Sequence, residues 1–138
     1  MEFTDKKEYK TISFSRIAND IVLFKYAPKI EIDLAAAKQL VVDRLDYTGG
    51  KSVYALIDFT NVKSVTKEAR DFMNSAEGGL KGISAGAFMS NNVVATLFIN
   101  LYLKVSHPPV PAKFFNTQKD AVEWLKKIED ERVLSFQV

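Results

Sequence analysis

The chain has 138 residues, of which 47% are hydrophobic and 26% are charged, and its net charge is +2. This length and composition are typical of one folded domain with an ordinary core, and they exclude a disordered chain. The chain has no cysteine and a single histidine, which excludes disulfides, thiol catalysis, cysteine-based zinc sites and any metal site with two histidines.

The first 30 residues predict a short lead-in and a hairpin. Residues 1–9 are polar and are expected to form a frayed lead-in. They lack the apolar core of a signal peptide, so we expect a cytoplasmic location. The β-type runs at residues 11–17 and 21–27 are separated by Asn19-Asp20, which predicts a turn between two paired strands.

The next segment predicts a helix followed by a buried strand. Asp33 has the side chain of an N-cap, and apolar residues follow it at helical spacing up to Leu45. Gly49-Gly50 ends this helix, because glycine adopts the left-handed exit conformation at little cost. Residues 52–59 form a near-continuous apolar run, which is typical of a strand buried on both faces in a parallel sheet.

The middle of the chain predicts two more helices around another buried strand. Thr66 is expected to cap a helix that Gly78-Gly79 terminates, and residues 83–89 form the next strand. A third helix is expected from Asn91 or Asn92 to about Val105. Its polar residues recur every fourth position and leave one narrow polar stripe, so we expect this helix to be mostly buried. They are Asn92, Thr96, Asn100 and Lys104.

The last third predicts a short strand and a final helix. The uncharged stretch between Lys81 and Lys104 is interrupted by polar residues, so it does not predict a membrane span. Residues 112–115 form the last expected strand, and Thr117 is expected to cap the final helix. The tail at 131–138 is of uncertain structure, and its apolar-rich part, residues 133–138, leaves an extra strand or an arm onto a neighbouring subunit as alternatives.

The element order is therefore β-β-α-β-α-β-α-β-α. Strands that alternate with helices favour right-handed crossovers and a parallel sheet. We predict a single α/β domain over residues 1–138, with a small mixed, mostly parallel five-stranded sheet and about four helices. The first strand is expected to be antiparallel at one edge, and residues 54–59 and 83–89 are expected to lie side by side and parallel.

Two segments carry a family resemblance. They are Val53-Tyr-Ala-Leu-Ile-Asp-Phe-Thr-Asn-Val62 and Lys113-Phe-Phe-Asn-Thr-Gln-Lys-Asp-Ala-Val-Glu-Trp-Leu125. The first is similar to the strand and turn of the STAS-like group, the family of anti-sigma-factor antagonists and their relatives. The second resembles the last strand and helix of the lipid-transfer-like branch of that group. The resemblance covers roughly residues 11–129 and implies a STAS-like fold with a non-enzymatic, regulatory role.

The chain departs from this family at the turn that antagonist members use for regulation. Those members present Asp-Ser-Ser/Thr-Gly, whose hydroxyl is phosphorylated by a partner kinase. Residues 65–69 here read Val-Thr-Lys-Glu-Ala, with Lys67 at the acceptor position. Kinase-driven partner switching is therefore not expected. Thr66 is the nearest hydroxyl, and we interpret it as a helix cap rather than a phosphosite.

Polar residues follow three consecutive predicted strands. The carboxyl ends of parallel strands meet on one side of a sheet, where helix N-termini offer free amides. We therefore expect these residues to share one rim, either as ordinary helix caps or as a shallow polar pocket for a small anion or a partner's backbone. They are Asp58, Thr60, Asn61, Ser90, Asn91, Asn92, Asn116 and Thr117.

Catalytic motifs are not apparent in the sequence. Asp58 has no visible acid partner, Thr60 has no activating histidine nearby, and His107 lies in a proline-flanked loop. No glycine-rich phosphate loop is present. We therefore predict no catalytic residue, metal or cofactor. Nucleic acid is not an expected partner either, because basic residues form no concentrated stripe.

The third helix is the other candidate site, and its apolar character leaves three interpretations. It is core, or it packs on a second subunit, or it lines a pocket for an apolar ligand; the residues of interest are Phe98, Tyr102, Val105 and Phe136. The sequence thus favours a regulatory or protein-interaction module that self-associates as a homodimer, with its protein partner unidentified. The alternative is a carrier or sensor of a lipid-like or other apolar small molecule.

Overall fold

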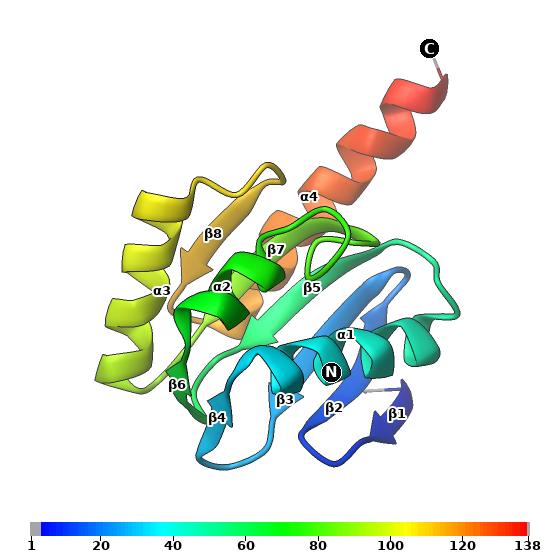
Figure 1. Ribbon diagram of the computed structural model, residues 1–138. Coiled ribbons are helices and arrows are strands. Elements are labelled where there is room, and N and C mark those ends of the chain that lie inside the picture. The colour runs from blue at the N-terminus through cyan, green and yellow to red at the C-terminus, as the bar shows by residue number, and fades with distance from the viewer. Residues whose placement is uncertain (1–3, 138) are drawn as a thin grey trace.

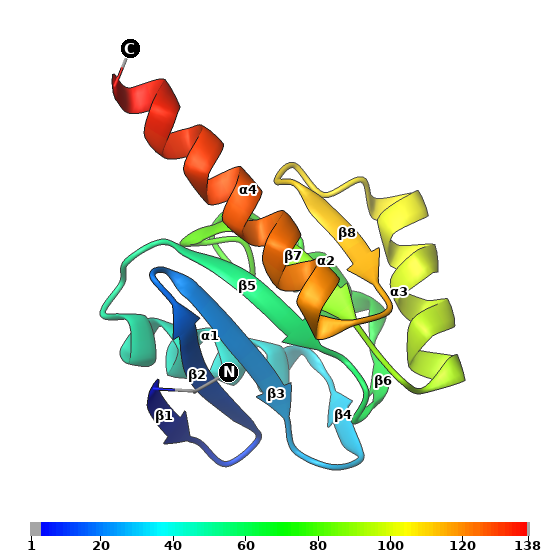
Figure 2. The same ribbon diagram turned by 180° about the vertical axis from the view of Figure 1, so that it is seen from behind.

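The structure is a computed structural model, which describes the backbone of residues 4–137 and the side chains of residues 5–134. A six-stranded sheet in the order β1-β2-β3-β5-β7-β8 has helices on both faces (Figures 1 and 2). Its strands are β1 (Thr4–Glu8), β2 (Ile12–Ala18), β3 (Ile21–Tyr26), β5 (Val53–Asp58), β7 (Ile83–Met89) and β8 (Ala112–Phe115). The helices are α1 (Leu34–Thr48), α2 (Lys67–Met73), α3 (Val93–Ser106) and α4 (Gln118–Gln137). A separate parallel pair joins β4 (Ile30–Ile32) to β6 (Val62–Val65).

The centre of the sheet is parallel, as the alternation of strands and helices predicts. Strands β3, β5, β7 and β8 run the same way, and β2 is antiparallel to β3. Tyr54 lies opposite Ala85, and Asp58 lies opposite Met89. The predicted parallel pairing of residues 54–59 with 83–89 is therefore confirmed, and with it the mixed, mostly parallel α/β fold.

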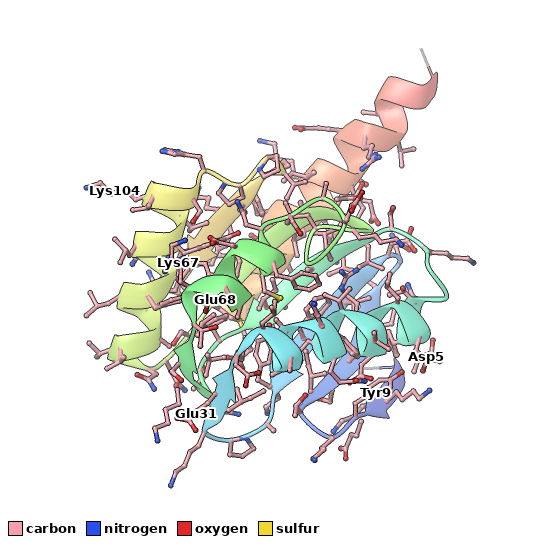
Figure 3. The ribbon with its side chains drawn as sticks, viewed as in Figure 1. Asp5, Tyr9, Glu31, Lys67, Glu68 and Lys104 are labelled. Carbon is pink, nitrogen blue, oxygen red and sulfur yellow. The ribbon has the colours of Figure 1, made fainter. Side chains whose placement is uncertain are left out.

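The sheet has six strands rather than the predicted five, because residues 4–8 form β1 instead of a frayed lead-in. Strand β1 pairs antiparallel with β2 and takes the edge position. Lys7 in β1 and Tyr9, which follows the strand (Figure 3), donate from the ammonium and the hydroxyl to Asp46 Oδ2, at 2.9 and 2.7 Å. Asp46 belongs to α1, so a contact with a residue distant in sequence adds to the pairing with β2. The polar residues of β1 gave no signal of either.

Both ends of α1 follow the capping rules. Asp33 Oδ1 accepts a hydrogen bond from the Ala36 amide at 2.8 Å, and Gly49 has a φ of 65° in the left-handed region. Helix α2 starts as predicted after Thr66, but it ends at Met73, before the predicted glycines. The chain then folds back on itself, and a Cβ on Gly79 would overlap the Met73 carbonyl. Gly79 therefore serves a close backbone approach.

The C-terminal segment is helical. Residues 131–137 continue α4, which extends past the edge of the sheet as the free end of the helix (Figures 1 and 2). Val133 and Leu134 are 50% and 60% exposed. The sequence left a strand and an arm as alternatives for this tail, and the helix prevails because its backbone hydrogen bonds need no partner strand.

Each face of the sheet has its own apolar core. Helices α1, α2 and α3 cover one face, and α4 covers the other (Figures 1 and 2). Strand β5 serves both, because its successive side chains alternate between the faces. Ala55 belongs to the three-helix core, whereas Tyr54 and Leu56 belong to the α4 core, where they pack with Leu125.

Candidate functional site

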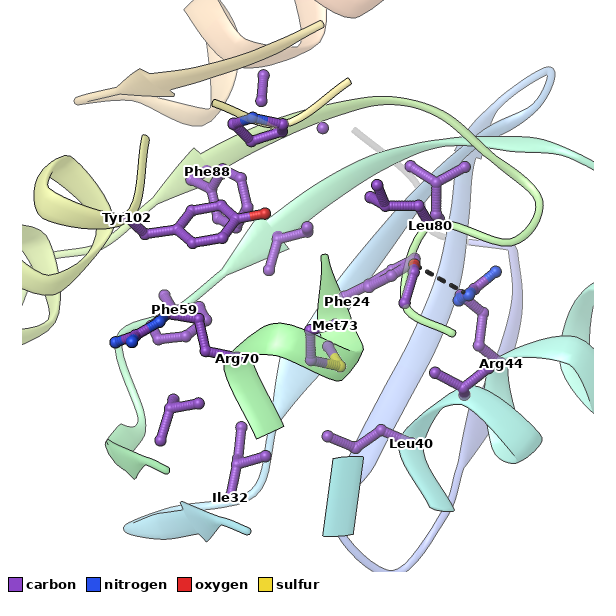
Figure 4. A pocket seen from close by; sticks show the side chains of 18 of the residues that line it. Phe24, Ile32, Leu40, Arg44, Phe59, Arg70, Met73, Leu80, Phe88 and Tyr102 are labelled. Atoms are coloured by element: carbon purple, nitrogen blue, oxygen red, sulfur yellow. Dashed lines mark hydrogen bonds between the residues drawn. The ribbon is translucent and has the colours of Figure 1, made fainter. Parts of the chain in front are cut away.

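An apolar cavity of about 110 Å³ lies between the sheet and helices α1, α2 and α3 (Figure 4). Phe24, Ile57 and Phe88 form its sheet side. An apolar cavity of about 150 Å³ holds a benzene-sized molecule. This space is slightly smaller, so it fits a small ring or a short alkyl chain.

The polar groups of the cavity wall are two arginines and two tyrosines. They are Tyr26, Arg44, Arg70 and Tyr102. Within residues 5–134, no Asp, Glu, Ser, Thr or His side chain contributes to the lining. The wall is therefore apolar with two positive charges and no negative one.

Arg44 is the most deeply buried of these charges. It extends from α1, and only 3% of the residue is exposed. Its guanidinium donates to the carbonyls of Lys81 at 2.6 Å and Gly79 at 3.2 Å. Burial lowers the pKa of Arg44 to about 10, so the side chain stays charged at neutral pH. Among the described side chains, no carboxylate forms an ion pair with it.

The other three polar groups differ in whether they have hydrogen-bond partners. The Tyr102 hydroxyl donates to Asn74 Oδ1 at 2.8 Å. The Tyr26 residue is 4% exposed, and burial raises the pKa of its hydroxyl, which therefore stays protonated. Neither this hydroxyl nor the half-buried Arg70 guanidinium finds a hydrogen-bond partner in the part of the chain that the structure describes.

Helix α3 contributes an aromatic cluster to the cavity wall. Phe98 stacks on Phe59 with ring centroids 5.7 Å apart, and Tyr102 meets Phe88 edge-on at 5.9 Å. Two of the residues that the sequence singled out, Phe98 and Tyr102, thus line the pocket. Phe136 lies in the last turn of α4, where side chains fall outside the described residues.

The outer side of α3 is exposed, whereas the sequence predicts a mostly buried helix. Only Ala95 and Ile99 are buried. The helix covers the sheet edge near β8, so one of its sides has no neighbour among the described residues (Figure 1). We call this surface the outer α3 face. Its large aliphatic residues are Val93, Val94, Leu97, Leu101 and Val105, which are 76, 68, 66, 59 and 66% exposed.

The polar residues at the ends of β5 and β7 come together as predicted and bond to one another. Asp58 Oδ1 accepts from the Thr60 amide at 3.0 Å, and Thr60 Oγ1 accepts from the Asn91 amide at 3.1 Å. The Asn92 side-chain amide donates to the Thr60 carbonyl at 3.4 Å. These bonds tie two strand ends together.

The remaining members of this group also serve local structure. Asn92 caps α3, where its Oδ1 accepts from the Val94 amide at 2.9 Å, and Ser90 Oγ accepts from the Asn92 amide at 3.0 Å. The Asn61 side-chain amide donates to the Tyr26 carbonyl at 2.9 Å.

The last two candidate hydroxyls are helix caps. Thr117 Oγ1 accepts from the Asp120 amide at the start of α4, and Thr66 Oγ1 accepts from the Ala69 amide at the start of α2, both at 3.2 Å. Asn116 lies beside Thr117 at the end of β8. The polar groups of the predicted rim are thus mainly engaged as caps and turns.

Sequence reasoning missed Arg44, Arg70 and Tyr26. A usable signal for Arg44 was present, because it falls on the apolar face of α1, four residues after Leu40 and three after Val41. A cation at such a position either extends its side chain to water or is buried where other groups compensate its charge. Arg70 and Tyr26 gave no signal, since their place in the wall depends on how α2 and β3 pack.

These features describe a mixed, mostly parallel α/β domain with an apolar, arginine-containing cavity. The fold is similar to the crystal structure of an uncharacterized DUF3478-family protein with a SpoIIAA-like fold from Shewanella loihica PV-4. The TM-score is 0.58 with 21% identity over 83% of this chain and 91% of that chain. The predicted STAS-like resemblance is thereby confirmed for the fold.

The chain belongs to the family DUF7793, a domain of unknown function, whose model matches residues 15–129. A search of proteins with curated descriptions found no match. Among the residues that the structure describes, no helix has the length and apolarity needed to cross a membrane. Nor does any group of three or more His, Asp or Glu side chains with metal-site geometry occur within that same part of the chain.

Proposed function

We propose that this domain is a non-catalytic carrier or sensor of a small apolar molecule, which it holds between the sheet and helices α1–α3. The single observation that carries the proposal is the cavity of about 110 Å³ with its almost wholly apolar wall. Native interiors are packed as densely as organic crystals, so a space of this size inside a core is uncommon. It is a natural binding site for an apolar ligand.

The composition of the wall favours binding over turnover. General acid–base catalysis needs titratable groups within hydrogen-bond reach of the reacting atoms. The wall formed by the described residues offers arginines and protonated tyrosines instead. The carboxylate that the sequence considered, Asp58, is bonded to the Thr60 amide at the strand end.

The test is a titration with 1-hexanol and, separately, with benzene. Binding is monitored by isothermal titration calorimetry and by the NMR signals of the Ile57 and Leu40 methyl groups. Saturable binding with shifts confined to the cavity is expected. Gly86 lies in the wall, and a Cβ there would meet Phe88 Cε2 at 3.7 Å and Ile57 Cδ1 at 3.9 Å, which is ordinary contact. Gly86→Val should therefore fill space and weaken binding, with Gly86→Ala intermediate. Failure of both neutral probes and of their charged analogues to saturate would refute the carrier function.

A second observation favours self-association. The outer α3 face presents five large aliphatic side chains that are each more than half exposed. Exposed apolar stripes of this kind mark interaction surfaces. We propose that a second copy of the chain covers it, as in a regulatory domain that works as a homodimer.

Charge placement supports a second copy as the occupant. Helix α3 has 14 residues and a single charged one, Lys104, near its C-terminal end. Two-fold pairing of antiparallel helices would keep the two lysines at opposite ends of a contact about 21 Å long. Identical apolar faces then meet without like charges opposite each other.

Light scattering at micromolar concentration tests this second candidate, with a dimer expected. The informative variants are Leu97→Asp and Leu101→Asp, because Phe98 packs inward on Phe59 and its replacement would disturb the core. Both should be folded and monomeric. Leu134→Asp is the matched control, since Leu134 is equally exposed but lies on α4. A monomeric wild type, or a dimer that survives Leu101→Asp, would contradict this assembly. If the wild-type protein is monomeric and co-sediments with lipid vesicles, the outer α3 face binds a bilayer instead.

A further inference from the structure

The cavity wall is apolar but carries two positive charges and, among the described residues, no negative one. We infer that the molecule held there is a small apolar monocarboxylate, whose carboxylate group is bound by Arg44. This inference rests on the proposed carrier function and adds the chemical class of the ligand.

The burial of Arg44 is the first argument. Removing a cation from water is strongly unfavourable unless it is paired or fully hydrogen-bonded. At 3% exposure, Arg44 is compensated by two carbonyls alone, those of Gly79 and Lys81. A guanidinium has five N–H donors, so about three remain free for another acceptor. A carboxylate matches this need best, because it brings a negative charge and accepts two parallel hydrogen bonds.

The Tyr26 hydroxyl is the second argument. Residue Tyr26 is 4% exposed and lines the cavity, and its hydroxyl is protonated and forms no hydrogen bond to any residue that the structure describes. Tyr26 and Arg44 both line the cavity, so a molecule that fills it contacts both side chains. A carboxylate beside Arg44 would give this hydroxyl an acceptor. One ligand group would thus satisfy two incompletely paired side chains.

Arg70 is the weaker anchor. Figure 4 shows its side chain well apart from Arg44 in the cavity wall. It is half-buried, so water can hydrate its head while the stem lies on apolar surface. A hydrated cation such as Arg70 is stabilised less by an anionic ligand than a cation that is shielded from water, such as Arg44.

Cavity size limits the rest of the ligand. A space of about 110 Å³ accommodates a ring or a short alkyl chain rather than a long acyl chain. Hexanoate and phenylacetate are suitable probes. Acetate has the same charged group without an apolar body, and 1-hexanol has the body without the charge.

The decisive comparison uses the wild-type protein. Calorimetric titration at pH 7 should show hexanoate binding about tenfold tighter than 1-hexanol or better, because hydrogen bonds to charged groups contribute more than neutral ones. Acetate should show no measurable binding. Equal affinity for hexanoate and 1-hexanol would overturn the assignment of a carboxylate while leaving the carrier function intact. Absence of binding by every probe would overturn both.

Variants then assign the anchor. Arg44→Met should remove the preference for hexanoate and keep 1-hexanol binding, whereas Arg44→Lys should retain part of the preference. Arg70→Met is the matched control and should change the preference little. If the preference survives Arg44→Met or disappears in Arg70→Met, Arg44 is not the anchor. Should Arg44→Met fail to fold, Tyr26→Phe provides the second test, with a loss of hexanoate affinity and unchanged 1-hexanol affinity.

Discussion

One face of the sheet is covered by a single helix, α4, whereas α1, α2 and α3 share the other (Figures 1 and 2). On the α4 side, the fully buried alanines Ala85, Ala87 and Ala121 let the helix lie close to the strands. On the three-helix side, aromatic rings such as Phe24 and Phe88 line a cavity.

The difference shows how residue size decides whether a sheet face closes. Small side chains allow one helix to seal the surface at native packing density. Large flat rings meet edge-on or stacked at centroid distances of 5.1 to 6.3 Å on this side, and rigid shapes of that kind leave gaps that shorter side chains do not fill. Binding capacity therefore resides on the aromatic face.

The largest expected effect is a difference in the free energy of unfolding between two leucine truncations, one on each face of the sheet. Leu125→Ala on α4 should lower the free energy of unfolding by about 3 to 5 kcal/mol, since the side chain is fully enclosed. Leu40→Ala on α1 should cost about 2 to 3 kcal/mol, because Leu40 already faces the cavity and has fewer contacts to lose. Urea denaturation measures both. Equal losses would mean that the three-helix face is packed as tightly as the other.

A smaller effect on stability is expected when one methyl group is added or removed at two neighbouring residues of β7. The methyl group added by Gly86→Ala lies at the cavity wall. This variant should stabilise the protein by about 0.5 to 1 kcal/mol, because the methyl group fills space and restricts the unfolded chain. Ala87→Gly on the closed face should destabilise it by about 1 kcal/mol. Thermal unfolding of the pair provides the comparison, and a destabilised Gly86→Ala variant would show that the cavity is not free space.

The smallest effect concerns the edge strand at the margin of the three-helix face. Hydrogen bonds from Tyr9 and then Lys7 lower the pKa of the exposed Asp46 carboxyl below its ordinary value. This interaction stabilises the fold above the ordinary carboxyl pKa and is lost as the pH falls through the lower folded-state value. Asp46→Asn should therefore show a slightly flatter decrease in urea midpoint between about pH 4 and pH 2. Superimposable profiles for wild type and variant would show that β1 does not depend on this contact.

Local chemistry was readable for much of the fold. The caps at Asp33, Thr66 and Thr117, the exit at Gly49 and the parallel pairing of β5 with β7 follow from residue type and hydrophobic pattern. Strand β1 was missed because its residues are polar, which hides its pairing with the adjacent β2, and because its contact with Asp46 is distant in sequence. The burial of α3 was overestimated, since an apolar helix at a sheet edge has the same composition as a central one.

The candidate site was only partly readable. Phe98 and Tyr102 were identified because a helix so rich in apolar residues needs an explanation, and they do line the cavity. The polar strand ends met as expected, but their groups mainly bond to one another and to helix ends. No pattern in the sequence connects Tyr26, Arg44 and Arg70, which come from different elements.

The sequence by itself determined the alternation of strands and helices, the helix N-caps and the parallel centre of the sheet, because these depend on interactions between residues close in the chain and on alternation along each strand. Only the tertiary structure decided that one face closes around alanines, that the other encloses a cavity, and that Arg44 is buried in its wall. The physical reason is that a cavity is the volume left over when helices from distant parts of the chain pack together. Such a volume depends on the shapes of all its neighbours at once and on no single segment.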